Sequence, residues 1–311
     1  MPIRGSMGNN QQSFSTGVGF VLLATLGWSL SGLFVRLMPG LNGWQVNCWR
    51  GLFMSLALLI YLLVVYGKDT LAVFKKVPPA ALILSALFFA VGTTCYVTSL
   101  TMVSTATVSI IGATSPLVTG LLSPWITGEK PGILAWISAM LAVIGMAFIA
   151  KGGFETGHIA GLLLSLGVPV LFALQTLMLR RYRNIDMMPS ICLGGFLAFL
   201  AAAFFSQFSG AGGSAFAIDQ HSFWLLMVMG PIQLTIPLIF YGMGARSVPA
   251  ITLALISMLD AVINPLWPWL FVNEVPENST LIGGSIILFA IVVCLFGNRV
   301  LAQMALKSDA H

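Results

Sequence analysis

Apolar residues occur along this chain in runs of about 20 residues, and short polar or charged links separate the runs. A run of this length is what an α-helix needs to cross a hydrocarbon core of about 30 Å. The first run is too long for the apolar segment of a cleaved signal peptide, so we expect it to be retained. The pattern predicts ten transmembrane helices, at residues 17–38, 44–66, 79–100, 103–126, 132–150, 158–180, 189–208, 222–243, 247–271 and 279–298.

The composition excludes a soluble protein. Hydrophobic residues make up 58% of the 311 residues and charged residues only 7%, whereas soluble domains are about 45–50% apolar and about 25% charged. So few ionic side chains cannot cover a water-facing surface, and most of the surface must face lipid. The cysteines lie in or beside apolar runs without C-x-x-C spacing, and we interpret them as small buried hydrophobic residues rather than metal ligands: Cys48, Cys95, Cys192 and Cys294.

The basic residues orient the predicted helices. With the N-terminus in the cytoplasm, the outer side receives only Arg36 and Lys151, and Arg50 falls inside the second helix. The positive-inside rule therefore predicts that both termini are cytoplasmic, and it explains the net charge of +5 without a nucleic-acid partner. The cytoplasmic side receives Arg4, Lys68, Lys75, Lys76, Lys130, Arg180, Arg181, Arg183, Arg246, Arg299 and Lys307.

The two halves of the chain resemble each other at an offset of 144 to 145 residues. Each half holds five predicted helices, and because five is odd the second half enters the membrane upside down. We therefore expect two inverted five-helix repeats around a central cavity, at 17–151 and 152–300, between a disordered tail at 1–16 and a cytoplasmic tail at 301–311. The matches include Gly17 with Gly161, Trp28 with Phe172, Arg36 with Arg180, Gly51 with Gly195, Tyr96 with Tyr241, Val103 with Val248 and Glu129 with Glu274.

Inverted repeats have a mechanistic consequence. The halves can exchange conformations, so a state open to one side implies a related state open to the other. Such alternating access favours a transporter over a receptor or an enzyme. The alternative is that duplication only built a stable scaffold.

The stretch from Tyr96 to Ile149 carries a family resemblance. It combines an Ala/Ser/Thr-rich helix start, Pro116, the Gly128-Glu129 pair and a final apolar helix. In these features it resembles the EamA-type repeat of the drug/metabolite transporter superfamily. The second half departs from the pattern, because Asp260-Ala261 stands in place of Ser115-Pro116, and Asn273-Glu274 in place of Gly128-Glu129.

The resemblance implies ten helices, a bacterial inner-membrane location and a cavity between the halves. Within the superfamily the chain looks most like bacterial exporters of aromatic and other amino acids, so the leading hypothesis is a secondary exporter of neutral amino acids. Export of drugs or other small metabolites is the alternative, and a membrane enzyme or channel is a distant one. The sequence carries no Walker loop and no HExxH motif, and we expect no cofactor, metal or catalytic residue. The expected partners are a small solute and the lipid bilayer, and a monomer is compatible with the sequence.

Two ionisable residues at membrane depth are candidate substrate ligands, because burying a charge there is costly. Asp260 lies near the middle of the ninth predicted helix and is a candidate for binding a substrate ammonium or a proton. The alternative is a structural acid bonded to neighbouring helices. Arg50 is a candidate for a substrate carboxylate, but a structural role, reaching the outer interface or a loop carbonyl, is favoured.

Aromatic and amide side chains complete the candidate cavity. Trp28, Tyr96 and Tyr241 sit well inside predicted helices, and the two repeat-related tyrosines should face each other if both point inward. A partly polar aromatic wall suits amino-acid side chains, although ordinary packing is the alternative for each residue. The polar candidates are Gln175, Gln233 and Asn264, which should face the cavity or another helix, and Ser257 and Thr94, which often bond to their own helix.

Three further residues are candidates for gating or structure. Pro116 removes a helical hydrogen bond and should bend the fourth helix. Glu129 and Glu274 end the fourth and ninth helices on opposite sides of the membrane, where each could hold one closed state. Capping of the short loops that follow is the favoured alternative for both acids.

Overall fold

The computed structural model describes residues 13–38, 40–100, 102–103, 105–149, 159–208, 214–264, 266–272 and 278–308, and within these ranges every regular element is a helix. The first half contains α1 (Phe14–Trp28), α2 (Ser31–Arg36), α3 (Gly43–Tyr66), the short η1 (Gly67–Asp69), α4 (Thr70–Lys76), α5 (Pro79–Leu100), α6 (Thr105–Gly112), α7 (Ser115–Ile126) and α8 (Ile133–Ile149). The second half contains α9 (Ile159–Arg181), α10 (Met188–Phe205), α11 (Gln220–Met229), the π-helix η2 (Gly230–Thr235), α12 (Ile236–Gly244), α13 (Ala250–Ser257), α14 (Leu259–Ile263), α15 (Leu266–Val272) and α16 (Asn278–Ser308).

Six of these helical segments are long and apolar enough to cross a membrane. Each predicted run contains helix, and the six long segments match the runs at 44–66, 79–100, 158–180, 189–208, 222–243 and 279–298. The other four runs fold as shorter or interrupted helices, which the apolar pattern alone does not reveal. The outer surface agrees with a lipid environment, because large apolar side chains such as Val64, Ile133 and Leu163 are at least 65% exposed.

The interruptions fall at particular residues. The first run breaks at Ser29 and Leu30, between α1 and α2. The fourth run breaks at Ala113 and Thr114, directly before Pro116 in the first turn of α7, in agreement with the expected effect of proline. The ninth run breaks at Met258, between α13 and α14.

Two details of the chain differ from the sequence prediction. Helix α1 begins at Phe14, inside the predicted disordered tail, because the Ser13 side chain caps the helix by accepting from the Thr16 amide at 3.2 Å. The predicted link after the second run contains the extra helix α4, which buries Thr70 and Val73. Residues 1–12 and Glu274 lie outside the described residues.

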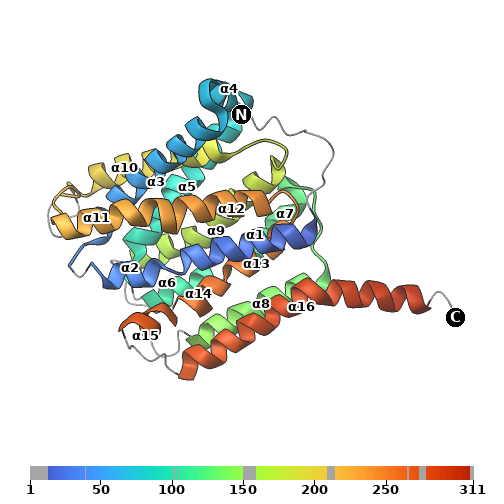
Figure 1. Ribbon diagram of the computed structural model, residues 1–311. Helices are drawn as coiled ribbons and strands as arrows, with labels where there is room; N and C mark the ends of the chain where they lie inside the picture. The colour runs from blue at the N-terminus through green and yellow to red at the C-terminus, as the bar shows by residue number, and fades with distance from the viewer. Residues whose placement is uncertain are drawn as a thin grey trace.

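The helices pack in a regular set of pairs. Helix α1 packs on α12, α5 on α9, α3 on α10, and α8 on α16. In Figure 1, α8 and α16 run side by side along one edge of the bundle, and α16 continues beyond it toward the C-terminus. Glycines permit the closest approaches: a Cβ atom on Gly145 would lie 2.7 Å from the Gly283 carbonyl oxygen.

Contacts between the halves also involve glycines. Gly17 packs on Val248, and Gly161 packs on Val103. A Cβ atom on Gly51 would lie 3.0 Å from the Gly195 carbonyl oxygen. Because the neighbour at Gly51 is backbone rather than a flexible side chain, a larger residue there must push α3 and α10 apart.

We therefore expect Gly51→Leu to lower the free energy of unfolding by about 1–3 kcal/mol, as overpacking of a close contact does. Gly19→Leu is the matched control, because no atom lies within 4 Å of a Cβ atom built on that helical glycine. The measurement is the thermal unfolding midpoint of the two variants in detergent. Equal midpoints would show that the α3–α10 contact is not tight.

Candidate functional site

The interruption between α1 and α2 is a meeting point for polar groups of the second half. The Gln233 side-chain amide donates to the Trp28 carbonyl at 3.2 Å, from within the π-helix η2. The Trp267 indole donates to the Ser29 hydroxyl at 2.8 Å, and the Asn264 amide to the Ser31 hydroxyl at 3.2 Å. Two of the predicted cavity amides therefore lie at this break, and single π-helical turns are frequent at functional sites.

An aromatic cluster lies beside this break. The ring centroids of Trp28 and Tyr241 are 5.0 Å apart, and Phe172 lies 6.5 Å from Trp28 and 6.1 Å from Tyr241. Tyr241 is buried, and its hydroxyl makes a 2.9 Å hydrogen bond with Thr176 and interacts with Ser257. This cluster, formed by Trp28, Phe172 and Tyr241, joins α1, α9 and α12.

Tyr96 differs from its repeat partner. Its side chain is 39% exposed, and no ring contact within the described part of the chain includes it. No ring contact within the described residues joins Tyr96 to Tyr241, which is enclosed in the aromatic cluster. Tyr96 instead lies within electrostatic reach of both Arg50 and Asp260.

Arg50 is fixed by a chain of hydrogen bonds. Its guanidinium donates to the Thr93 hydroxyl on α5 at 3.0 Å, and that hydroxyl donates to the Asn47 side chain at 2.9 Å. Arg50 therefore points across to α5 rather than to a loop carbonyl, and the hydrogen bond to Thr93 uses only one of its five donor positions.

Asp260 occupies the first turn of α14, directly after the break at Met258. Its Oδ1 atom is buried and has no hydrogen-bond partner among the described residues, and the same holds for the Gln233 Oε1 atom. A buried acceptor without a partner costs about 1–3 kcal/mol, and more when it is charged. Such groups commonly mark places where a ligand or water completes the bonding.

Two predicted cavity residues are bonded elsewhere. Gln175 is buried and bonds through its amide to the Ser85 hydroxyl at 3.0 Å, and Ser85 in turn contacts Ser190 at 2.9 Å. Gln175 therefore joins α5, α9 and α10, which is the helix–helix alternative weighed for it. Thr94 donates to the Ala90 carbonyl of its own helix at 2.8 Å.

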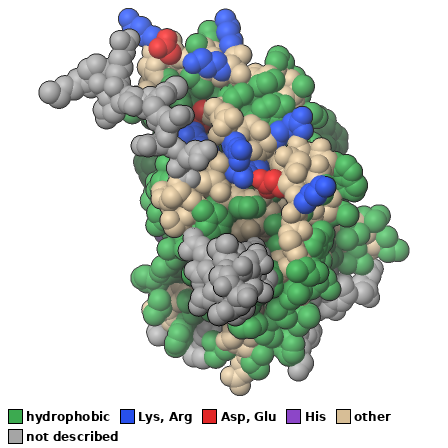
Figure 2. All heavy atoms as spheres, turned by 90° about the vertical axis from the view of Figure 1, so that its right-hand side faces the viewer, with side chains coloured by type: hydrophobic (Ala, Val, Ile, Leu, Met, Phe, Trp, Pro, Cys, Tyr) green, Lys and Arg blue, Asp and Glu red, His purple; other side chains and the backbone are tan. Residues whose placement is uncertain are grey.

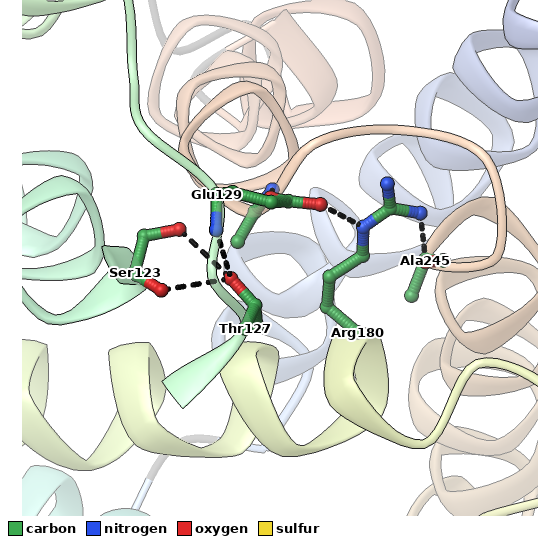
Figure 3. Close-up of polar contacts among 6 residues, drawn as sticks. Ser123, Thr127, Glu129, Arg180 and Ala245 are labelled. Carbon is green, nitrogen blue, oxygen red and sulfur yellow. Dashed lines mark hydrogen bonds and ion pairs between the residues drawn. The ribbon is translucent and has the colours of Figure 1, made fainter. Parts of the chain in front are cut away.

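A second polar site lies where α7 ends. Gly128 has a φ of 77°, a left-handed conformation typical of the residue after a helix, and it turns the chain into Glu129. Glu129 Oε1 pairs with Arg180 Nε at 2.5 Å, and its Oε2 accepts from the Ala250 amide at 3.0 Å. The Arg180 Nη1 atom donates to the Ala245 carbonyl at 3.0 Å (Figure 3).

This arrangement, here called the Glu129–Arg180 latch, fastens the two halves together. It links the end of α7 to α9 and to the segment between α12 and α13, and Arg181 adds a hydrogen bond to the Ile126 carbonyl. Glu129 does more than cap its loop, because both its carboxylate oxygens bond to residues of the other half.

Sequence reasoning missed several of these residues. Phe172 was noted only as the repeat partner of Trp28, and Arg180 only as a cytoplasmic basic residue and the repeat partner of Arg36. Both signals were present, because a repeat position that keeps its aromatic or its cation suggests a shared role. Thr93 and Asn47 carry no sequence signal that separates them from ordinary helix residues.

Comparison with known proteins agrees with a multi-pass membrane transporter. Residues 15–151 match the EamA-like transporter family. The first half of the chain is thus similar to this transporter family, as the resemblance in the sequence indicated. One solved crystal structure of a protein has the same fold, with a TM-score of 0.78 at 17% identity, and the superposition covers 92% of this chain and 99% of that one.

Relatives with names are also transporters. The S-adenosylmethionine uptake transporter of Rickettsia conorii is 25% identical over 297 residues, which cover 94% of this chain and 97% of the relative. The protein of that name in Rickettsia bellii is 23% identical, covering 94% and 98%. The uncharacterized transporter YdfC of Bacillus subtilis is 23% identical, covering 81% and 82%. These names indicate transport and do not support amino-acid export.

We expect Glu129→Gln to destabilise the fold in this conformation. Arg180 is only 8% exposed, and removing one partner of a buried ion pair costs about 3–5 kcal/mol; because Glu129 is 26% exposed, the expected loss lies at or below the lower end of that range. Lys130→Gln is the control, an exposed neighbour. Thermal unfolding in detergent measures both, and an unchanged midpoint for Glu129→Gln would mean that the latch contributes no stability.

Proposed function

We propose that this chain is a secondary transporter for a small, positively charged metabolite that carries an amino-acid group, with S-adenosylmethionine as the leading substrate. The observation that carries the proposal is the buried Oδ1 atom of Asp260, which has no hydrogen-bond partner among the described residues. The names of the two Rickettsia relatives support the same class of solute. Amino-acid export becomes the second candidate.

The chemistry of S-adenosylmethionine matches the groups at the site. It carries a sulfonium, an ammonium, a carboxylate and an adenine ring, and its net charge is positive. Asp260 compensates the positive charge, and the remaining donors of Arg50 are available to the carboxylate. Trp28 and Phe172, the half-buried members of the aromatic cluster, offer flat faces that attract both an adenine ring and a sulfonium. A neutral amino acid could also place its ammonium at Asp260 and its carboxylate at Arg50, so the sulfonium and the adenine ring are what distinguish S-adenosylmethionine from it.

The transport mechanism that we propose is alternating access between two inverted repeats of five spans each, at 17–151 and 152–300. Packing supports this mechanism. Helix α1 corresponds to α9 in the repeat, and α5 corresponds to α12, so the contact of α1 with α12 is the repeat equivalent of the contact of α9 with α5. Single contacts support it as well. Gly27 packs on Pro237, and their repeat equivalents, Leu171 and Gly92, also pack on each other. The Glu129–Arg180 latch closes one end of the bundle in this conformation and must open in the other.

We further propose that the latched end is cytoplasmic, with both termini on that side of a bacterial inner membrane. Lys and Arg side chains gather on the face of the molecule seen in Figure 2, which is the right-hand side of Figure 1, with few acidic ones among them. Such an excess of basic residues is characteristic of cytoplasmic loops.

The test is uptake into proteoliposomes of radiolabelled S-adenosylmethionine, S-adenosylhomocysteine, phenylalanine and leucine. S-adenosylhomocysteine lacks the sulfonium charge but keeps the adenine and the amino-acid group. We expect saturable uptake of S-adenosylmethionine and at least about tenfold less of the other three, because S-adenosylhomocysteine lacks the sulfonium that the aromatic faces attract and the two amino acids lack both the sulfonium and the adenine ring. Preferred uptake of phenylalanine would favour amino-acid export instead. Uptake of none of the four solutes would overturn both S-adenosylmethionine transport and amino-acid export.

The role of Asp260 has its own test. Asp260→Asn should lower S-adenosylmethionine uptake at least about tenfold, since it removes the compensating charge, while uptake of S-adenosylhomocysteine should change little. Asp69→Asn is the control, an exposed acid in η1 far along the chain from the site. Equal loss for the two solutes would show that Asp260 does not recognise the sulfonium, because the ammonium is common to both solutes.

A further inference from the structure

A small cleft opens on the surface between α3, the segment that joins α9 to α10, and α12. Its polar lining consists of Tyr61, Arg183, Asp186 and Arg246, and the remaining lining residues include Met188 and other apolar residues. The cleft has a volume of about 20 Å³, enough for one oxygen-sized atom. A larger ligand would insert one atom and rest at the mouth.

The two arginines at this cleft have unused donors. Both side chains are exposed, and within the described ranges neither makes a hydrogen bond or an ion pair. Arg246 lies within electrostatic reach of the hydroxyls of Tyr61 and Tyr66, which places its charge at the cleft. The Tyr61 hydroxyl likewise makes no hydrogen bond to a described residue.

The one acidic residue of the lining is already bonded. Asp186 Oδ2 accepts from the Tyr66 hydroxyl at 2.7 Å, and its Oδ1 accepts from the Met188 amide at 2.9 Å. Its carboxylate therefore bonds within the fold, and the lining keeps an excess of positive charge. What the cleft offers to a ligand is two guanidinium groups and one phenol hydroxyl, all of them donors.

We propose that this cleft binds a phosphate group, with one oxygen inserted between Tyr61, Arg183 and Arg246. Guanidinium groups present paired N–H donors that match the oxygens of a phosphate, and charge-assisted bonds of this kind are about twice as strong as neutral ones. A carboxylate ligand fits less well, since it has two oxygens to share among three donor groups.

The source that the surroundings favour is the headgroup of an anionic phospholipid. On α3, Ile60 is 60% exposed and Val64 is 79% exposed, and Val64 lies three residues from Tyr61 on the same helix face. A phosphate held at the cleft would therefore have apolar, lipid-facing surface next to it for its acyl chains. Basic pockets between transmembrane helices at a membrane surface recognise anionic headgroups in this way.

The test measures lipid binding to the purified full chain in detergent by native mass spectrometry. The probes are phosphatidylglycerol, phosphatidylcholine and the soluble glycerol 3-phosphate. We expect phosphatidylglycerol to bind the native protein, and R183Q/R246Q to bind it about tenfold more weakly, because two charge-assisted contacts are lost. Tyr61→Phe should weaken binding to a smaller extent, since it removes one hydroxyl only.

The matched control is K75Q/K76Q, which removes the same number of charges from α4 without touching the cleft. The thermal unfolding midpoint of R183Q/R246Q in lipid-free detergent should equal that of the native protein, because the guanidinium groups of Arg183 and Arg246 make no bonds to described residues. If glycerol 3-phosphate bound as strongly as phosphatidylglycerol, the cleft would still be a phosphate site, but its ligand would be a soluble phosphate rather than a lipid. Equal weakening in K75Q/K76Q, or no loss in R183Q/R246Q, would overturn the site.

Discussion

In a lipid environment every backbone N–H and C=O group must find a partner within the protein, and this constraint governs where the chain can be polar. A continuous helix meets it without help, but each interruption leaves backbone groups that need another donor or acceptor. The break after Trp28 shows the result, because its freed carbonyl accepts from Gln233 of the other half. Polar side chains therefore collect where helices are interrupted, and the candidate site is built there.

The breaks of the two halves have unequal chemistry. At matching positions the first half has Ser115-Pro116 and the second has Asp260-Ala261, each in the first turn of a helix that follows a break. Proline supplies the interruption in the first half without adding charge. In the second half an acid occupies the same turn, so the charge of the interior is asymmetric even though the packing of the helices is nearly symmetric. A symmetric scaffold can in this way hold a ligand with an oriented charge.

The sequence was a good guide to the helices and a poorer guide to their ends. Apolar runs of about 20 residues identified the long segments because length and hydrophobicity decide membrane crossing. The break at Pro116 was foreseeable from proline, whereas the break at Ser29 was not, since no residue there forbids a helix. The start of α1 at Phe14 depends on a serine cap, which an apolar pattern does not record.

Side-chain partners were harder to foresee for a related reason. Glu129 was identified from its repeat position, but its pairing with Arg180 depends on how α7 meets α9, which is a tertiary contact. The repeat suggested that Tyr96 and Tyr241 are equivalent, and they are not, because Trp28 and Phe172 enclose only Tyr241. Pattern analysis thus identifies which residue types are available, while packing decides which of them meet.

The π-helix η2 determines the direction in which the side chains that follow it in the same helical segment point. In an α-helix each residue advances the direction of a side chain by about 100°, because a turn holds 3.6 residues. The wider turn of η2 accommodates an extra residue, so everything after it is rotated by about that angle relative to a continuous α-helix. As a result α11 packs on α3, while α12 packs on α1 and directs Tyr241 toward Trp28. The position of Tyr241 in the aromatic cluster therefore depends on the extra residue in η2, which ends at Thr235, before Tyr241 in the chain.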